Sequence, residues 1–410
     1  MATKPFSFVG LDIGSSKIAT IVGTVDESGA PGILGTGVAP SSGLRKGVVI
    51  DVEETVSAIS ASLEQAERVS GIHVDRVIIS VNGSHVSSLN SKGVIAVGRA
   101  DGEISQEDIS RVIEAAQAVS IPTNREIIHV IPRIFTVDGH EGIKDPVGMN
   151  GVRLEAETHI ITGSTPIIKN LTKCVYQAGL NIDDMVLSPL AAARATLGKR
   201  QRELGSVLVD IGGGTTGVAV FEEGDILYTG ILPIGAGHVT NDIAIGLRTS
   251  LEVAEKIKLE HGYAQAEGVS EKDKITIADE ATNDVVETTK RQVAEIIEAR
   301  MEELFSMVRS DLKKVGRDAL LPAGVVLTGG GAKLPGLVEL AKEELRLPAQ
   351  IGIPSGVKGI ADTIEDPAYA TGVGLLLWAF DNYEEGIQPR VQQLGSNVGR
   401  AKRWFRNFLP

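Results

Sequence analysis

The pattern of apolar and polar positions predicts a chain built from two similar halves. The first half opens on FSFVGLDIG, a turn and KIATIVGTV, both rich in the β-branched residues that favour strands. Residues 206–220, SVLVDIGGGTTGVAV, repeat this order, which places Asp12 and Asp210 at corresponding positions. Each hairpin continues into a further short strand, GILGTGVAP in one half and DILYTGILPIG in the other. The repeat therefore predicts a duplicated α/β core.

Two segments have no counterpart in the repeat and predict additional subdomains. From about residue 85 to residue 160, a helix over ISQEDISRVIEAAQ with a capping-box pattern at its start precedes two strand-like segments. Residues 249–322 hold an acidic stretch and then a helix over 291–314 with apolar residues at three-to-four spacing. Because this stripe ends at Leu312, a helix packed on its own domain is favoured over a free coiled coil.

The apolar pattern stops shortly after Trp378, and the polar segment that follows is typical of a flexible linker. The expected boundaries are 1–84 with 161–200 for the first core half, 85–160 for an inserted α+β subdomain, 201–248 with 323–380 for the second core half, 249–322 for its upper subdomain, 381–397 for the linker and 398–410 for a terminal helix.

Composition and charge narrow the class of protein. A chain of 410 residues with 42% hydrophobic residues can form two or more domains with a large core. Lys and Arg number 40 against 53 Asp and Glu, and the net charge of −13 argues against a generally basic nucleic-acid-binding protein. The single cysteine, Cys174, excludes an intrachain disulfide and fits a reducing compartment such as the cytoplasm.

Glycine-rich turns follow three apolar strands, in LDIGSSK, VDIGGGTTG and VVLTGGGAKLPGL. Glycine lets backbone N–H groups approach phosphate oxygens closely, and the helix after the third turn is expected to point its N-terminus at the ligand. One such turn alone is as consistent with a plain tight turn, whereas three after strands favour a phosphate site. Asp12 and Asp210, facing each other across a cleft, would hold a hydrated Mg²⁺. The absence of a Walker A sequence and of a GxGxxG fingerprint with a following acid argues against P-loop and Rossmann sites.

These motifs resemble the two phosphate motifs and the adenosine motif of the actin, heat-shock-70 and sugar-kinase ATPase superfamily. LSPLAAARATLG and DPAYATGVGLLLWA are similar to its two interdomain helices. IKDPVGMNGVRLEAETHIITG, GAGHVTNDIAIGL and the C-terminal tail resemble, more narrowly, the FtsA family of bacterial cell-division proteins. The resemblance implies an actin-like ATPase fold of two duplicated ribonuclease-H-like halves, with an inserted α+β subdomain in the first half and a C-terminal amphipathic tail.

The resemblance also implies ATP and Mg²⁺ as ligands, with Asp12 and Asp210 holding the metal through water. The residues along the β- and γ-phosphates would be Gly14, Ser15, Ser16, Lys17, Gly212, Gly213, Gly214, Thr215 and Thr216. The nucleoside would lie against Gly329, Gly330, Gly331 and Ala332, its ribose near Glu255 and Lys258, and the floor of the cleft would hold Gly235, Gly237 and His238. His238 could equally be an ordinary loop histidine.

One position departs from the superfamily pattern. Ser188-Pro189 stands where chaperone and rod-shape relatives carry Glu-Pro, whose carboxylate helps to orient the attacking water. A serine is a poor base unless another group activates it. We therefore expect no assigned catalytic base, firm ATP binding and slow or weak hydrolysis, with the nucleotide acting as a switch for conformation and assembly.

The last residues predict a helix that lies in a membrane interface. The residues of its apolar and basic faces are Val398, Trp404, Phe405, Phe408, Leu409, Arg400, Lys402, Arg403 and Arg406. Each buried aromatic ring contributes roughly 1.5 to 3 kcal/mol, and each basic residue about 1 kcal/mol at an anionic surface. A tail packed on its own body or a basic nucleic-acid patch are the alternatives. Without the last twelve residues the charge is 36 − 53 = −17, so attachment to anionic lipid would depend on the tail.

The resemblance implies a cytoplasmic, peripheral protein at the inner face of the cell membrane at the division septum. It would polymerise, tether the FtsZ ring and help to recruit later division proteins. The C-terminal peptide of FtsZ would bind the upper subdomain, where Arg300 is either a partner contact or a solvated charge. The alternative is a metabolic kinase or phosphatase of the same superfamily, for which the sequence offers no assignable substrate base.

Overall fold

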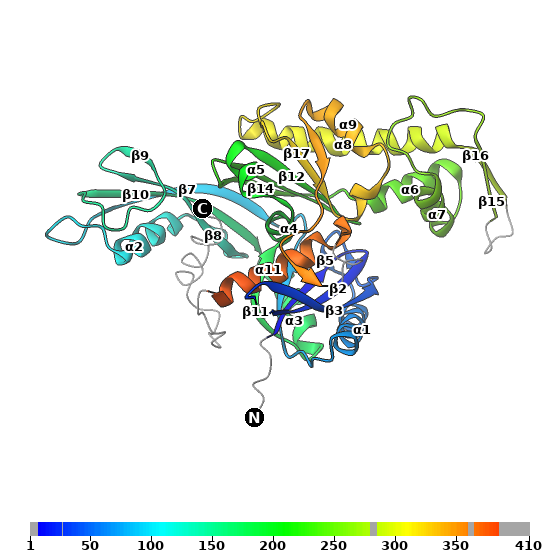
Figure 1. Ribbon diagram of the computed structural model, residues 1–410. Helices are drawn as coiled ribbons and strands as arrows, with labels where there is room; N and C mark the ends of the chain where they lie inside the picture. The colour runs from blue at the N-terminus through cyan, green and yellow to red at the C-terminus, as the bar shows by residue number, and fades with distance from the viewer. Residues whose placement is uncertain (1–6, 27, 279–284, 360–364, 385–410) are drawn as a thin grey trace.

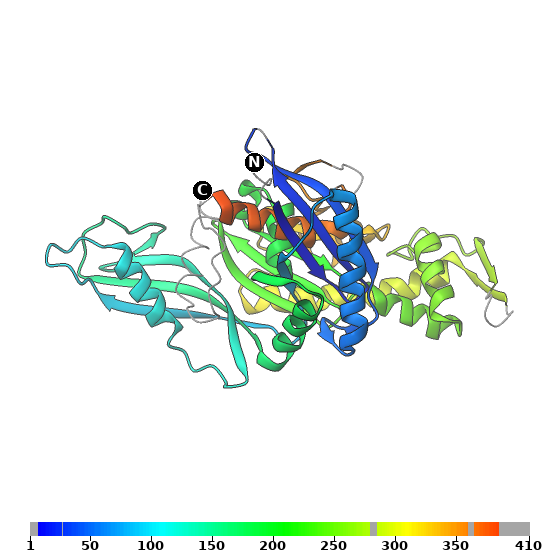
Figure 2. The same ribbon diagram turned by 90° about the horizontal axis from the view of Figure 1, so that it is seen from below.

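The computed structural model describes residues 7–26, 28–278, 285–359 and 365–384, and the structural statements below concern these residues. Two core sheets lie together in the centre, and two smaller units project from opposite ends of the molecule (Figures 1 and 2). The terminal helix expected over 398–410, with every membrane-binding residue named above, and the linker beyond Glu384 lie outside this part of the chain. No helix within it is long and apolar enough to cross a membrane.

The two core sheets repeat one strand order, which confirms the duplicated halves. The first sheet runs β11 (Asn181–Leu187), β6 (Arg76–Val81), β1 (Ser7–Ile13), β2 (Lys17–Val25), β3 (Pro31–Pro40) and β19 (Lys358–Gly359). The second runs β18 (Ala349–Ile351), β17 (Val325–Thr328), β12 (Ser206–Ile211), β13 (Thr216–Glu222) and β14 (Asp225–Leu232). In both sheets the first hairpin is antiparallel. The first strand of the hairpin, β1 or β12, also pairs in parallel with the strand on its other side, β6 or β17. The duplication thus covers five strands rather than the three that the sequence indicated.

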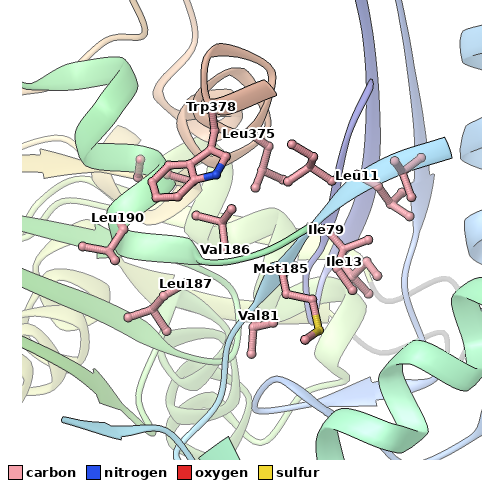
Figure 3. Packing of buried hydrophobic residues seen from close by; sticks show 14 of the residues in the cluster. Leu11, Ile13, Ile79, Val81, Met185, Val186, Leu187, Leu190, Leu375 and Trp378 are labelled. Carbon is pink, nitrogen blue, oxygen red and sulfur yellow. The ribbon is translucent and has the colours of Figure 1, made fainter. Parts of the chain in front are cut away.

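Helices α4 (Ser188–Thr196) and α11 (Ala370–Glu384) join the halves, while α1 (Val52–Ser70) and α3 (Thr165–Gln177) pack on the first half. On β2, Thr20 bonds to Ser62 of α1, and the next residue, Ile21, faces Gly372 of α11, so the two helices cover opposite faces. Figure 3 shows Trp378 and Leu375 of α11 packed with Leu190 of α4 over the β1 and β11 side chains. One hydrophobic cluster includes strands of both sheets, and it holds the halves together.

The inserted unit is a four-stranded antiparallel sheet with one helix. The strand order is β7 (Ser87–Ala96), β10 (Arg153–Ser164), β8 (Arg125–Val137) and β9 (His140–Ile143), and α2 (Gln106–Gln117) packs on it. The expected capping box is present, since Ser105 accepts from the Asp108 N–H and the Asp108 carboxylate accepts from the Ser105 N–H. The predicted helix and both predicted strands are confirmed.

The second projecting unit carries α6 (Ala236–Leu247), α7 (Leu251–His261), β15 (Lys274–Ala278) and β16 (Val285–Thr289). The helix expected over 291–314 is α8 (Lys290–Lys314), and its apolar stripe is buried. It ends beneath the second core sheet, where α9 (Leu337–Leu345) also packs. The short α5 (Lys199–Leu204) leads into β12.

The expected start of the linker at residue 381 is wrong, because α11 continues to Glu384. The Asp381 carboxylate accepts two hydrogen bonds from the Arg194 guanidinium of α4, at 2.7 and 2.8 Å. The polar residues after Phe380 show no apolar periodicity, so the sequence alone did not reveal that an ion pair between the two helices extends α11.

A candidate nucleotide cleft

The two glycine turns that follow β1 and β12 face each other from the two halves. Each turn is closed by a backbone bond, from Gly14 N to Lys17 O at 3.1 Å and from Gly212 N to Thr215 O at 2.9 Å. A Cβ atom on Gly213 would lie 2.8 Å from the Cβ of Ser16, closer than side chains approach. Glycine is therefore required for this approach, and the two turns meet at the junction that is the candidate nucleotide cleft.

Two carboxylates, the partly buried Asp12 and the buried Asp210, lie at the ends of the strands that lead into these turns. Asp12 accepts a hydrogen bond from Ser80 Oγ at 2.9 Å, and Asp210 accepts one from Thr371 Oγ1 at 3.1 Å. Burial raises the pKa of Asp12. Burial, and after it the charge of Asp12, raises the pKa of Asp210 to about 7. The structure thus brings the two carboxylates of the predicted metal pair close enough for the charge of Asp12 to oppose the ionisation of Asp210.

A cation between Asp12 and Asp210 would remove this repulsion, so the pair fits a divalent metal. No third acidic, histidine or cysteine side chain completes a metal cluster in the part of the chain that the structure describes. Two carboxylates suit Mg²⁺, which keeps several waters and uses phosphate oxygens as further ligands. The residues therefore fit an Mg²⁺ nucleotide better than a metal held by protein alone.

Lys17, which is predicted to contact phosphate, is the first residue of β2, directly after the first glycine turn. Its ammonium lies 3.8 Å from the ring centroid of Tyr369 in the 3₁₀ turn η2 (Pro367–Tyr369). Burial lowers the pKa of Lys17, while the charges of Asp12 and Asp366 act in the opposite direction. The nearby Asp366 binds Lys333 at 2.6 Å. Lys17 is thus a partly desolvated cation close to the carboxylates of Asp12 and Asp210.

The start of α6, which is predicted to form the floor of the cleft, lies against the second glycine turn. Ala236 N donates to Gly212 O at 2.9 Å and Gly237 N to Gly213 O at 2.8 Å, which fixes α6 to the second turn. His238 Nδ1 accepts from Gly235 N at 3.1 Å. Burial lowers the pKa of His238, so a neutral ring can accept this bond. His238 therefore caps its own helix, in line with the interpretation as an ordinary loop histidine.

The third glycine turn lies directly behind Asp210. Gly329 has a φ of 82°, and a Cβ atom there would lie 2.4 Å from Asp210 Oδ1. The turn continues as the 3₁₀ helix η1 (Gly330–Lys333), which includes the buried Ala332. The sequence predicted an α-helix aimed at the ligand at this point, but α9 begins only at Leu337. Gly330 and Gly331 lie in η1, so short 3₁₀ structure occupies the expected helix start.

Glu255 and Lys258 lie on α7 and face α6. Lys258 Nζ donates to Glu255 Oε2 at 2.6 Å and to Thr240 Oγ1 at 2.9 Å. Its next neighbour is Ala236 O at 3.5 Å, in the first turn of α6. The two predicted ribose contacts therefore form one polar group beside the cleft floor.

The side chains of Thr216 and Arg300, both predicted site residues, form hydrogen bonds with other parts of the protein. Thr216 is fully buried and donates its hydroxyl to Ile234 O at 2.8 Å, because it already belongs to β13. Thr215, just before it, is also buried. Arg300 donates to Asp242 at 2.5 and 2.8 Å and also contacts Glu303, so it is neither a solvated charge nor an open contact. Its charge is satisfied within α6 and α8.

The sequence pattern did not identify Ser80 and Thr371, whose hydroxyls donate hydrogen bonds to Asp12 and Asp210. Ser80 also accepts from Ile13 N at 2.9 Å and so fixes the end of β1. The available signal was a hydroxyl inside each otherwise apolar segment, RVIISV and ATGVGLLLWA. A buried hydroxyl requires a partner, and the nearest strand end supplies one.

Comparison with known proteins shows which families and relatives the chain resembles. A family model described as cell division protein FtsA matches residues 207–374, and one described as the SHS2 domain inserted in FtsA matches residues 83–162. The cell division protein FtsA of Pseudomonas aeruginosa is 40% identical over 411 residues and is covered over 98% of both chains. That of Bacillus subtilis is 43% identical over 375 residues, which cover 92% of this chain and 84% of the relative.

Solved structures show the fold. The PilM–PilN type IV pilus biogenesis complex aligns with a TM-score of 0.67 at 17% identity, over 91% of this chain and 98% of that chain. MreB5 of Spiroplasma citri bound to ADP gives 0.55 at 14% identity, over 93% and 99%. The MamK double helical filament gives 0.50 at 14% identity, over 91% and 98%. The expected actin-like fold is confirmed.

Proposed function

Because the chain belongs to the FtsA family of cell-division proteins, we propose that it binds ATP and Mg²⁺ in the cleft and links a polymer of its own copies to the membrane. The family assignment rests on 40% identity across 98% of the chain. The observation that best supports the site is that Asp12 and Asp210 lie close together beside the two glycine turns. The kinase or phosphatase alternative is set aside, because the relatives that span the chain are cell-division proteins.

In this proposal the chain supplies a fixed phosphate cradle and charge neutralisation. Asp12 and Asp210 would hold the metal through water, and Lys17 and the N–H groups of the two glycine turns would contact the phosphates. Bound Mg²⁺ would neutralise phosphate charge. Gly329, Gly330, Gly331 and Ala332 would border the nucleoside, with Glu255 and Lys258 near the ribose.

Hydrolysis is proposed to be slow. Ser188 stands where chaperone and rod-shape members of the superfamily carry a glutamate. It is 2% exposed and donates its hydroxyl to Val81 O at 3.1 Å. A hydroxyl whose proton is engaged with a carbonyl, away from any base, does not activate water. The nucleotide state would then persist long enough to control assembly. A steady-state turnover like that of a metabolic kinase would contradict this part of the proposal.

The remaining parts follow from the family. The inserted unit of residues 85–160 would contact later division proteins and neighbouring copies, and the upper subdomain of 249–322 would bind the C-terminal peptide of FtsZ. Residues 398–410 would form the membrane helix, which places the protein at the cytoplasmic face of the membrane at the septum. The other domain boundaries given above are part of this proposal, with the end of the second core half moved to Glu384.

Liposome flotation tests the membrane part. Full-length protein should float with vesicles that contain anionic lipid, less so at high salt, and a chain ending at Gln393 should stay at the bottom. Phe405→Ser keeps every charge and should weaken flotation through the lost apolar contact. Equal flotation of the full-length and shortened chains would reject the tail as the anchor.

Sedimentation tests assembly and partner binding. Full-length protein with Mg²⁺-ATP and vesicles should pellet, and FtsZ should pellet with it. FtsZ that lacks its C-terminal peptide should remain in the supernatant. Co-pelleting that does not depend on the peptide would contradict the proposed partner contact, and loss of pelleting in Asp210→Ala would link assembly to the nucleotide.

A further inference from the structure

A short hairpin reaches the cleft from outside the three glycine turns. It consists of β4 (Leu44–Arg45) and β5 (Val48–Val49), joined by Lys46 and Gly47. Both joining residues have positive φ, 50° for Lys46 and 76° for Gly47. Such two-residue turns favour Asn or Gly at the first position, because a longer side chain is strained there. A lysine in this position is unfavourable for the turn itself, which points to another role for it.

The tip of the hairpin contacts both phosphate turns. Gly47 N donates to Ser15 Oγ at 2.9 Å, which ties the tip to the turn of the first half. A Cβ atom on Gly214 would lie 3.2 Å from Lys46 N and 2.9 Å from Ser15 Oγ. The hairpin therefore lies where the two turns meet, at the end of the cleft beyond Ser15 and Gly214.

Lys46 has no counterion among the residues that the structure describes. The described acidic side chains form no ion pair with it, whereas Lys17, Lys333 and Lys258 all lie beside carboxylates. The charge of Lys46 reaches His238 at the start of α6, where it adds to burial in lowering the pKa of that ring. A cation without a carboxylate partner, at the junction of two glycine turns, forms an environment suited to an anion.

We propose that Lys46 binds the terminal phosphate of a nucleoside triphosphate and makes the cleft distinguish ATP from ADP. This assignment rests on the proposed nucleotide function. Ser15, Ser16, Gly213 and Gly214 border the same end of the cleft, so a third phosphate would lie between them and the Lys46 ammonium. A diphosphate would leave this contact unmade, and Lys46 would then bind only water.

The test uses full-length protein and the variant Lys46→Gly. Glycine adopts positive φ without strain, so the substitution removes the cation and should keep or stabilise the hairpin. Lys46→Arg keeps a cation, and Arg45→Ala removes an exposed charge one residue away. The dissociation constants for Mg²⁺-ATP and Mg²⁺-ADP are measured by calorimetry for all four proteins, together with their melting temperatures.

We expect Lys46→Gly to weaken ATP binding by about 10- to 100-fold, which corresponds to one charge-assisted contact. ADP binding should change by less than about threefold, and Arg45→Ala should resemble the unchanged protein. Equal weakening for both nucleotides, or unchanged ATP preference, would overturn the assignment of Lys46 alone. Failure of the unchanged protein to bind either nucleotide would instead disprove the proposed function, and the Lys46 assignment with it.

Discussion

Asp210→Asn should make the nucleotide-free protein more stable at alkaline pH. Asp210 is 9% exposed and has a pKa of about 7, because burial and the charge of Asp12 both oppose its ionisation. Asparagine has nearly the same shape and keeps an oxygen that can accept the bond from Thr371 Oγ1. The substitution therefore removes a destabilising charge and retains the hydrogen bond.

The magnitude follows from linkage between protonation and folding. Between the ordinary pKa of 3.8 and the folded value of about 7, the folded chain keeps a proton at Asp210 that the unfolded chain has lost. Stability therefore falls as the pH rises through this window. From pH 5 to pH 8, this one group should lower the free energy of unfolding by about 2 to 3 kcal/mol.

Urea denaturation at several pH values, without nucleotide and with a chelator, measures the effect. The pH dependence of the unchanged protein should exceed that of Asp210→Asn, whereas Glu64→Gln, at an exposed position of α1, should match the unchanged protein. Adding Mg²⁺-ATP should stabilise the unchanged protein far more than the variant. Identical pH dependence in Asp210→Asn and the unchanged protein would refute the reasoning.

Two further substitutions test the packing that surrounds the site. Gly374→Ala would place a Cβ atom 1.8 Å from Ala191 O, where α11 crosses α4. It should therefore lower the free energy of unfolding by about 3 kcal/mol, measured by thermal unfolding. The control Gly32→Ala, whose Cβ atom would have its nearest neighbour at 3.7 Å, should change this free energy little. Thr229→Val should cost about 1 to 3 kcal/mol, because it leaves the buried His159 Nε2 without its partner at 2.9 Å, and an unchanged melting temperature would count against that bond.

The repeat of strand, turn and strand allowed most of the core to be predicted from the sequence. β-branched runs ending in Asp-Ile-Gly define β1 and β12, and the same order of residues places Asp12 and Asp210 in equivalent positions. Local patterns of this kind report on backbone conformation and on burial of one face. They suffice for the elements, for the capped α2 and for the pairing of the two carboxylates.

Contacts between distant segments could not be predicted in this way. The Arg300 side chain looks like an open charge on a helix until Asp242, 58 residues earlier, is placed beside it. Lys46 lies in the sequence GLRKGVVI, which shows no motif, and only folding brings it to Gly214. Thr216 shows the opposite error, since a motif residue is drawn into β13 and buried. In each case, a partner far along the chain decides the role of the residue.

The inserted unit is joined by its chain to the first half but also bonds to the second. Ser88 Oγ donates to Thr229 O at 2.7 Å, His159 contacts Thr229 Oγ1, and Lys144 pairs with Asp225. These partners lie on β14, which pairs with the β13 strand that leaves the second glycine turn. A movement of one half against the other that opens the cleft must therefore carry the inserted unit along or break these bonds. Each of these polar bonds contributes only about 1 kcal/mol. The orientation of the inserted unit is therefore coupled to the state of the cleft, and breaking the bonds that couple them costs little free energy.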